Sequence, residues 1–326
     1  MKGKIEVKNL VKIYKSFNFG FLKRKSQDIV ALDNINFEIN PGEIVGYIGP
    51  NGAGKTTTIK ILSGILYPTS GYVLVNGINP FLKKNRKIHK KNIGVMLGHH
   101  SKLIRDLPVI DSFLLLGKIY ELSQKEINER IEKLISMLQI KEILNRKVRT
   151  LSLGQRIRCE LFATFLHSPP VLFLDEPTIG VDISTRYRLY EFIKKINKEE
   201  KITVIITSHD IHDIEMLAER IILIDNGKIL FDGKKEDFIK KFSSKKKKVF
   251  IEMENLFPEE EVKIFCENKK IKVQKIEDYK IVLEMDSDDN LLEILKEIEK
   301  YGFIKDIHIE RETLREIIKN IYENKK

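Results

Sequence analysis

The chain has 326 residues, 42% of them hydrophobic and 32% charged, which fits a soluble globular protein with one large or two medium domains. No apolar run approaches the roughly 20 residues that cross a bilayer, and the residues after Met1 lack the apolar region of a secretion signal, so we expect a cytoplasmic protein. Of the net charge of +11, the first 244 residues hold +13, which fits a nucleic acid partner, an anionic membrane surface or, most simply, a basic cellular background.

Two stretches near the amino terminus alternate between apolar and polar residues, and both are predicted to be half-buried strands: Lys4–Leu10 and Ala31–Ile39. The intervening residues, Tyr14–Val30, combine phenylalanines with lysine and arginine. Such a segment can stack on bases or touch lipid, but an ordered surface loop is the commoner explanation, and we expect one here.

A glycine-rich loop follows the apolar run Glu43–Ile48 and leads into the helical pattern Thr58–Leu62. Its spacing, G-x-x-x-x-G-K-T, is that of a phosphate-binding P-loop, in which backbone N–H groups and a helix amino end surround phosphates. Lys55 is placed to reach the outer phosphates of a nucleotide and Thr56 to ligate magnesium. The loop comprises Gly49, Pro50, Asn51, Gly52, Ala53, Gly54, Lys55, Thr56 and Thr57.

Beyond this loop the sequence alternates between strand and helix patterns, as in an α/β fold with a parallel sheet. Predicted strands lie at 72–75, 93–96, 171–174, 202–207, 221–225 and 228–231, and predicted helices at 156–167, 184–197 and 211–217. Residues from about 99 to 168 are rich in helical periodicity, with a capping box at Ser123 and Glu126, and are expected to form an inserted helical subdomain. Cys159 and Cys266 lack disulfide or zinc spacing and are expected to be buried.

Polar residues end two of the apolar runs that we predict to be buried strands. Asp175 and Glu176 follow Val171–Leu174, and His209 follows Ile202–Thr207. The carboxyl ends of parallel strands meet at one sheet edge, where ligands bind. We therefore expect Asp175 to hold magnesium, Glu176 to polarise the attacking water, and His209 to contact the γ-phosphate and hold that water.

A second anion site is predicted at Leu151–Gln155, where a serine hydroxyl and a glycine N–H precede a helix. One chain has no obvious use for two phosphate sites. Two copies facing head to tail would use both, because each nucleotide would lie between the P-loop of one chain and Ser152 and Gly154 of the other.

These motifs together resemble the ATP-binding cassette (ABC) ATPases. Walker A is Gly49–Thr56, the signature is LSLGQ at Leu151–Gln155, Walker B is Val171–Glu176, the D-loop is Pro177–Asp182, and the switch histidine is His209. The resemblance implies a P-loop NTPase core with a RecA-like parallel sheet, an antiparallel β subdomain and an inserted helical subdomain. It also implies ATP and Mg2+ as ligands, a homodimer, and Ser152, Gly154 and Gln155 as nucleotide contacts.

Two positions differ from the usual family pattern, and for a third, other residues of the chain could fill the same role. Tyr14 matches the aromatic residue that stacks on adenine, with Phe17, Phe19 and Phe21 as competing candidates; Leu153 replaces a signature glycine; and His99 stands where the Q-loop glutamine is expected. Imidazole can still contact magnesium or its water, although its strength as a ligand would vary with pH.

The segment Asp106–Phe113, the signature variant and the closing Thr313–Ile318 resemble type-2 ABC exporter ATPases of the daunorubicin-resistance kind. That resemblance implies an ATPase dimer on the inner face of the cell membrane, bound to separate permease subunits. A soluble ABC ATPase acting on nucleic acid or ribosomes is the alternative, but the second cassette or long coiled coils of such proteins do not appear, so no nucleic acid partner is expected. A module that binds ATP as a signal without hydrolysing it is a third possibility. It fits poorly, because Asp175, Glu176 and His209, the residues expected for hydrolysis, are all present.

The predicted domains are an ATP-binding domain at 1–244 and an accessory domain at 245–326. The run Lys245–Lys248 marks the boundary and is expected to be a solvated linker. Beyond it, the sequence contains both strand patterns and helix patterns, which predict a small α+β domain. A capping box is predicted at Thr313 and Glu316. This domain could regulate closure, steady the dimer or bind a ligand, and its sequence favours none of these.

Overall fold

A computed structural model describes residues 2–19, 24–98, 101–244, 246–269, 271–277, 279–286 and 290–323, without the side chains of 16–19 and 24–27. Contacts divide the chain into two compact units, Met1–Lys235 and Glu236–Lys326. The division falls shortly before the boundary that we predict between residues 244 and 245.

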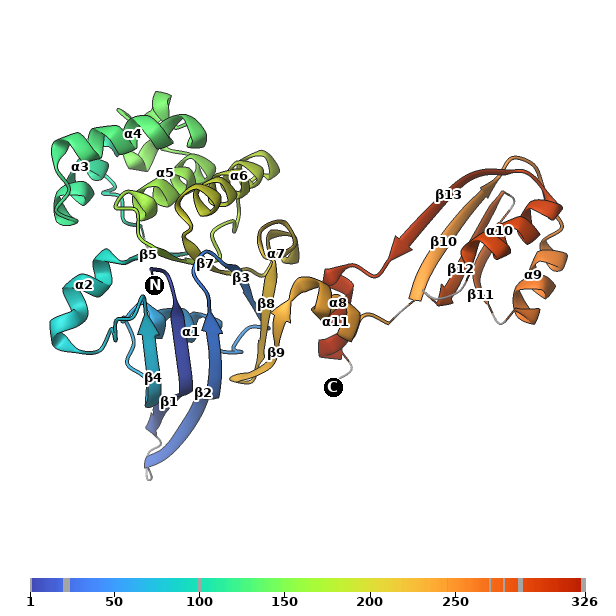
Figure 1. Cartoon of the computed structure of the whole chain (residues 1–326), viewed down its shortest axis with the longest axis horizontal. Coiled ribbons are helices and arrows are strands. Elements are labelled where there is room, and N and C mark those ends of the chain that lie inside the picture. Colours follow the sequence, from blue (N-terminus) through green and yellow to red (C-terminus); the bar gives the residue numbers. More distant parts are fainter. Residues whose placement is uncertain are drawn as a thin grey trace. The chain divides into compact units, whose positions relative to one another are not determined.

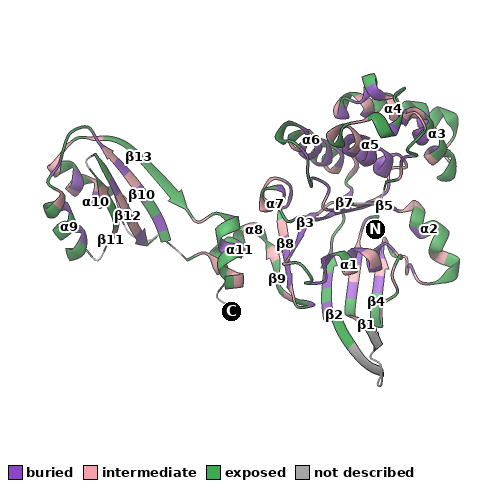
Figure 2. Ribbon diagram, turned by 180° about the vertical axis from the view of Figure 1, so that it is seen from behind, coloured by how far each residue is buried: buried purple, intermediate pink, exposed green. Residues whose placement is uncertain are grey.

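The first unit is built on a sheet with the strand order β5-β6-β7-β3-β8-β9, which is parallel from β5 to β8 and ends with an antiparallel β9. Its central strands β3, β6 and β7 are buried throughout, as their continuous apolar sequences predict (Figure 2). The strands are β3 (Ile44–Ile48), β5 (Ile93–Leu97), β6 (Val171–Asp175), β7 (Thr203–Thr207), β8 (Arg220–Asp225) and β9 (Lys228–Lys234).

A second sheet of the first unit is antiparallel, in the order β2-β1-β4. It consists of β1 (Ile5–Phe19), β2 (Arg24–Ile39) and β4 (Ser70–Val75). The loop that we predict at 14–30 is therefore wrong in its described part, because both strands continue into this segment and pair as far as Phe19 and Arg24. Strand β4 ends in a turn at Asn76 and Gly77, and both residues have positive φ.

The first unit also contains helices, some packed against the parallel sheet and others, at 109–119 and 124–138, packed on further helices (Figure 1). They are α1 (Lys55–Leu62), α2 (Arg86–Lys91), α3 (Val109–Ile119), α4 (Gln124–Leu138), α5 (Leu153–Phe165), α6 (Ile183–Glu200) and α7 (Ile211–Leu217), with short 3-10 turns at Lys83–Asn85, Lys141–Ile143 and Val148–Thr150. The capping box of α4 is confirmed. Helix α5 begins three residues earlier than predicted because Ser152 caps it, and α2 is not predicted from the sequence.

The second unit contains an antiparallel sheet in the order β11-β12-β10-β13, with strands β10 (Lys246–Met253), β11 (Lys272–Glu277), β12 (Lys280–Asp286) and β13 (Ile304–Arg311). Its helices are α8 (Lys235–Phe242), α9 (Glu259–Asn268), α10 (Leu291–Ile298), a 3-10 turn at Glu299–Tyr301, and α11 (Leu314–Glu323). The core includes Val249, Ile251, Ile281 and Leu283. The α+β prediction holds, and so does the capping box at Thr313.

The prediction of a solvated linker at Lys245–Lys248 is wrong from Lys246 onward. Lys246 begins β10, which pairs with β12 on one side and β13 on the other. Lys246 pairs with Glu284, and Lys247 is buried. None of the described helices in either unit combines the length and hydrophobicity that a bilayer crossing requires.

Candidate functional site

The P-loop connects β3 to α1 and leaves no room for side chains at two of its glycines. A Cβ atom at Gly49 would lie 2.3 Å from the carbonyl oxygen of Ile224, and one at Gly54, where φ is +110°, would lie 2.6 Å from that of Ala31. Ala53 is buried against the core, while Asn51 and Gly52 are exposed at the turn. The loop backbone is therefore tightly held, with its tip open to solvent.

Lys55 is buried, and its Nζ donates to the carbonyl oxygens of Gly49 at 2.7 Å and Pro50 at 3.0 Å. Burial lowers the pKa of Lys55, and the negative charges of Glu176 and Asp175 oppose that shift. The ammonium thus lies inside the loop that the sequence identifies, bonded only to carbonyls in the described residues. A phosphate group is a stronger acceptor than these carbonyls and could take over its hydrogen bonds.

Thr56 and Asp175, the two predicted magnesium ligands, are in contact. Thr56 Oγ1 lies 3.1 Å from Asp175 Oδ2, and Thr207 Oγ1 donates to Asp175 Oδ1 at 2.5 Å. The pair supplies the hard oxygen donors that Mg2+ prefers, and Mg2+ commonly takes few protein ligands beside phosphate and water. The residues present therefore fit a magnesium ion held jointly with a nucleotide.

Glu176 and His209 also lie together, as the strand ends predict. His209 Nε2 is 2.6 Å from Glu176 Oε1, and the Glu176 N–H donates to the carbonyl of Thr207 at 3.0 Å. Glu176 has a φ of +55°, a left-handed conformation that costs a non-glycine residue of order 1–3 kcal/mol. Backbone strain of this kind marks a side chain whose direction is fixed by its surroundings.

Tyr14, on β1, reaches the P-loop helix. Its hydroxyl is 3.4 Å from Thr57 Oγ1, its side chain is 39% exposed, and the Lys12 ammonium lies 5.2 Å from its ring centroid. The rival Phe21 lies outside the described residues, as do the side chains of Phe17 and Phe19. Tyr14 therefore has a partly exposed aromatic face beside the phosphate loop.

Ser152, Gly154 and Gln155 form a separate group at the amino end of α5. Ser152 Oγ accepts from the Gln155 N–H, and the Gln155 side chain accepts from the Ser152 N–H, which is a capping box. A Cβ atom at Gly154 would lie 3.1 Å from Thr185 Oγ1 on α6. Among the described residues, no hydrogen bond joins this group to the P-loop.

A cleft of about 210 Å3 lies beside the amino end of α1 and the carboxyl ends of β5 and β6. It is lined by Thr56, Lys60, Leu97, Gly98, Asp175, Glu176 and Ile179. The Gly98 N–H donates to the carbonyl of Asp175 at 3.2 Å, so the end of β5 is held at the same place. His99, the predicted Q-loop residue, follows directly but lies outside the described residues. Its role stays a prediction.

Two residues at this site are not singled out by the sequence. Thr207, the last residue of β7, holds the Asp175 carboxylate, and Gly98 holds its backbone. The position of Thr207 two residues before His209, at the end of a buried strand, is the signal that could have revealed it. Gly98 offers no comparable signal.

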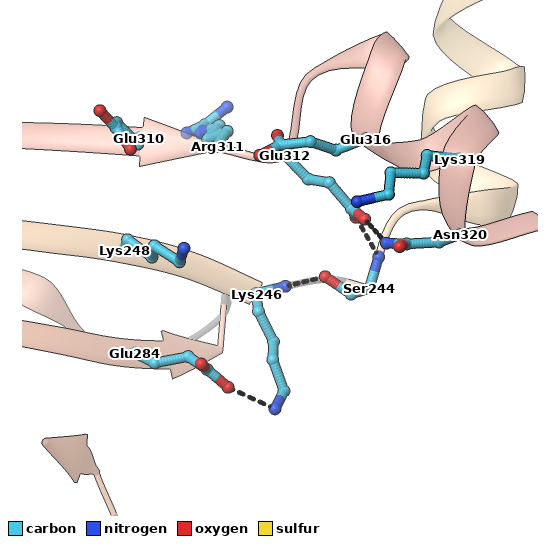
Figure 3. Close-up of a pocket in the computed structure, with 10 residues that line it drawn as sticks. All are labelled: Ser244, Lys246, Lys248, Glu284, Glu310, Arg311, Glu312, Glu316, Lys319 and Asn320. Carbon is cyan, nitrogen blue, oxygen red and sulfur yellow. Dashed lines mark hydrogen bonds and ion pairs between the residues drawn. The ribbon is translucent and has the colours of Figure 1, made fainter. Parts of the chain in front are cut away.

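A second pocket, of about 320 Å3, lies in the second unit (Figure 3). Lysine and glutamate side chains from β10, β12, β13 and α11 line it, together with Ser244. The Lys246 ammonium lies 2.6 Å from Glu284, which raises the pKa of that lysine, and Glu312 accepts from the Ser244 N–H and from Asn320. The lining mixes cations and anions, some of them already paired, so it does not favour a ligand of one charge.

Comparison with known proteins gives a consistent result. A family model described as "ABC transporter" matches residues 32–179. The chain is 33% identical over 243 residues to an uncharacterised ABC transporter ATP-binding protein, MJ1023, of Methanocaldococcus jannaschii, covering 74% of this chain and 82% of that one. It is 32% identical to the Nod factor export ATP-binding protein I of Cupriavidus metallidurans, covering 65% of this chain and 69% of the other.

A solved structure agrees with these sequence relatives. The ATP-binding cassette MJ0796, determined as a dimer in a post-hydrolysis state bound to ADP and Pi, superposes with a TM-score of 0.61 at 30% identity. The match covers 71% of this chain and 98% of that structure.

Proposed function

Since this chain belongs to the family of ABC transporter ATP-binding proteins, we propose that it is the ATP-hydrolysing subunit of an exporter, working as a homodimer with separate permease subunits. The chain has the α/β fold of that family, and it is an ATPase that binds ATP. The exporter assignment is supported by relatives such as the Nod factor export protein. Its location on the inner face of the cell membrane belongs to the same proposal.

The observation that carries the proposal is the meeting of two pairs beside the P-loop, Thr56 with Asp175 and Glu176 with His209. We assign Lys55 and the loop N–H groups of Gly49–Thr57 to the phosphates and Tyr14 to the adenine ring. Thr56 and Asp175 would hold Mg2+, which when bound neutralises phosphate charge and orients the outer phosphates.

Glu176 is assigned as the group that accepts a proton from the attacking water. A general base must lie within hydrogen-bond reach of that water, and the cleft between Glu176 and Thr56 gives it room. His209, in contact with Glu176, would donate to the γ-phosphate and keep the water in line. The ADP product would then leave as the dimer opens.

Ser152, Gly154 and Gln155 are assigned to the nucleotide of the partner copy. The reasons are the absence of a described hydrogen bond to the chain's own P-loop, their place at the amino end of α5, and the relative MJ0796, which was determined as a dimer bound to ADP and Pi. His99 is assigned to the magnesium or its water, in place of a glutamine. Each closed dimer would hold two ATP molecules.

The permease is proposed to dock in a groove of about 320 Å3 between α2, β5 and α3. Ile65 and Ile119 at the groove are 58% and 62% exposed, and Lys87 and Lys90 lie beside them. Apolar side chains with a basic rim would fit a partner segment that has apolar and acidic residues. Lys102 also lines the groove, so docking would touch the segment that follows His99.

The experiment purifies the chain from detergent-solubilised membranes and identifies membrane-spanning polypeptides that accompany it. The double variant Ile65→Asp/Ile119→Asp is expected to lose these polypeptides by at least about tenfold, or about 1.4 kcal/mol. The new carboxylates would have to lose their hydration on docking and would repel acidic residues of the partner. ATPase activity of the isolated chain should change little.

The matched control is Ile264→Asp, which makes the same change at a 57% exposed position on α9 and should leave association intact. Co-purification with ribosomes or DNA, unaffected by the groove variant, would replace the exporter proposal with the soluble alternative.

A further inference from the structure

Asp213, on α7, is a carboxylate with no solvent exposure. Three hydroxyl groups surround it: Oδ2 accepts from Thr178 and Ser208, and Oδ1 accepts from Tyr190. A buried charge is tolerated when hydrogen bonds replace its hydration, and these three donors do so. The donors come from three places in the chain, namely the loop after β6, helix α6 and the loop after β7.

The direction of these hydrogen bonds is fixed. Ser208 Oγ accepts from the Asp210 N–H at 3.0 Å, so its own hydrogen is free to point at Asp213. Burial, followed by the hydrogen bond to Asp213, raises the pKa of Tyr190, so its phenol keeps the proton that it donates. Asp213 thus accepts from three donors at once, which favours one arrangement of the surrounding loops.

The two loops that Asp213 joins are those that carry the catalytic pair. Thr178 is two residues after Glu176, and Ser208 directly precedes His209. Arg186 on α6 makes a second bridge between the same loops, since its Nε donates to the carbonyl of Val181 at 3.1 Å and its guanidinium pairs with Asp210. The 2.6 Å contact between Glu176 and His209 therefore depends on loops that α6 and α7 hold together.

We propose that Asp213 is a positioning residue for ATP hydrolysis, whose buried carboxylate fixes the loop after Glu176 against the loop that carries His209. The inference rests on the roles proposed above for Glu176 and His209. Asp213 is fully buried and would act through its hydrogen bonds with Thr178 and Ser208. A displacement of about 1 Å in a reacting group can cost about 100-fold in rate.

The test is steady-state ATPase kinetics of Asp213→Asn in the full chain, corrected for the folded fraction. The amide keeps the size of the carboxylate but loses its charge and turns one acceptor into a donor. We expect kcat to fall about 10- to 100-fold, with KM for ATP within about threefold of the parent. In the Glu176→Gln background the variant should still form the ATP-bound dimer, because binding groups are untouched.

Stability is controlled with Asn197→Ala, which removes hydrogen bonds to the carbonyls of Gly42 and Ile202 from the far end of α6. This variant should lower the melting temperature and leave kcat per folded molecule unchanged. If Asp213→Asn does not fold, Thr178→Val and Ser208→Ala each remove one link, and each should lower kcat about 3- to 10-fold. Partial recovery of kcat in Asp213→Glu, which restores the charge, would further support the proposal.

The proposal is overturned if kcat per folded molecule is unchanged in Asp213→Asn, or in both single-link variants where it does not fold. It is also overturned if Asn197→Ala loses as much kcat at an equal loss of melting temperature. A failure of the roles proposed for Glu176 and His209 can be distinguished from this result. In that case Glu176→Gln would retain full ATP turnover, regardless of the effect of substitutions at Asp213.

Discussion

Glu176→Gln is expected to lower ATP turnover about 10²- to 10⁴-fold, the range typical of removing a general base. Glutamine keeps the shape of the side chain and its hydrogen bond with His209 Nε2, which lies 2.6 Å from Glu176 Oε1, but it cannot accept a proton from water. ATP binding should persist because Lys55 and Thr56 are unchanged. Phosphate release measures turnover, and equilibrium binding of labelled ATP measures affinity.

The matched control is Glu132→Gln, which makes the same change on an exposed position of α4 and should leave turnover unaltered. Undiminished phosphate release in Glu176→Gln would end the assignment of the base. Another carboxylate, with Asp175 the nearest candidate, would then have to take its place.

Lys55→Ala is expected to weaken nucleotide binding itself. The lysine makes two hydrogen bonds inside the P-loop, and a charge-assisted contact with phosphate is worth about 1.5–3 kcal/mol. The Kd for ATP should therefore rise about 10- to 100-fold, with turnover lost at ordinary ATP concentrations. Isothermal titration with Mg-ATP measures the change.

Lys125→Ala, at a position whose side chain is 85% exposed on α4, provides the comparison, since it removes the same charge far from the loop. An unchanged Kd in Lys55→Ala would mean that the ammonium stays on the carbonyls of Gly49 and Pro50 when ATP binds. The loop N–H groups would then hold the phosphates alone.

Much of the nucleotide-binding half could be predicted from the sequence because its signals are local. The P-loop, the paired acids at 175 and 176, and His209 each follow a continuous apolar run, and buried parallel strands produce such runs. Parallel topology brings the carboxyl ends of these strands to one edge of the sheet, which explains why the amino-acid sequence alone places Thr56, Asp175 and His209 near one another.

The long hairpin of β1 and β2 could not be predicted as readily. The outer parts of its strands pair mainly with each other, and Ile29 and Val30 are 54% and 50% exposed, so no buried face imposes a clear alternation. The lysine run at 246–248 could not be predicted as a strand for a different reason. Lys246–Lys248 form a strand because β12 and β13 flank it, a tertiary effect that overrides low strand propensity.

Asp213 has no signal in the sequence at all. It is one acid in a short amphipathic helix, and its hydroxyl partners, Thr178, Tyr190 and Ser208, lie up to 35 residues away. Thr207, by contrast, ends a strand that the apolar pattern predicts. Long-range polar clusters of this kind become visible only when the loops are placed in space.

In the proposed mechanism, two copies of this chain trap ATP at a shared interface, between Lys55 of one and Ser152 of the other. The most direct measurement is the molar mass of purified Glu176→Gln by light scattering with saturating Mg-ATP. A dimer is expected with ATP and a monomer without it, and Ser152→Trp, which places a bulky side chain at the interface, should prevent dimer formation. A particle that remains strictly monomeric with bound Mg-ATP would rule out a nucleotide site shared between two copies.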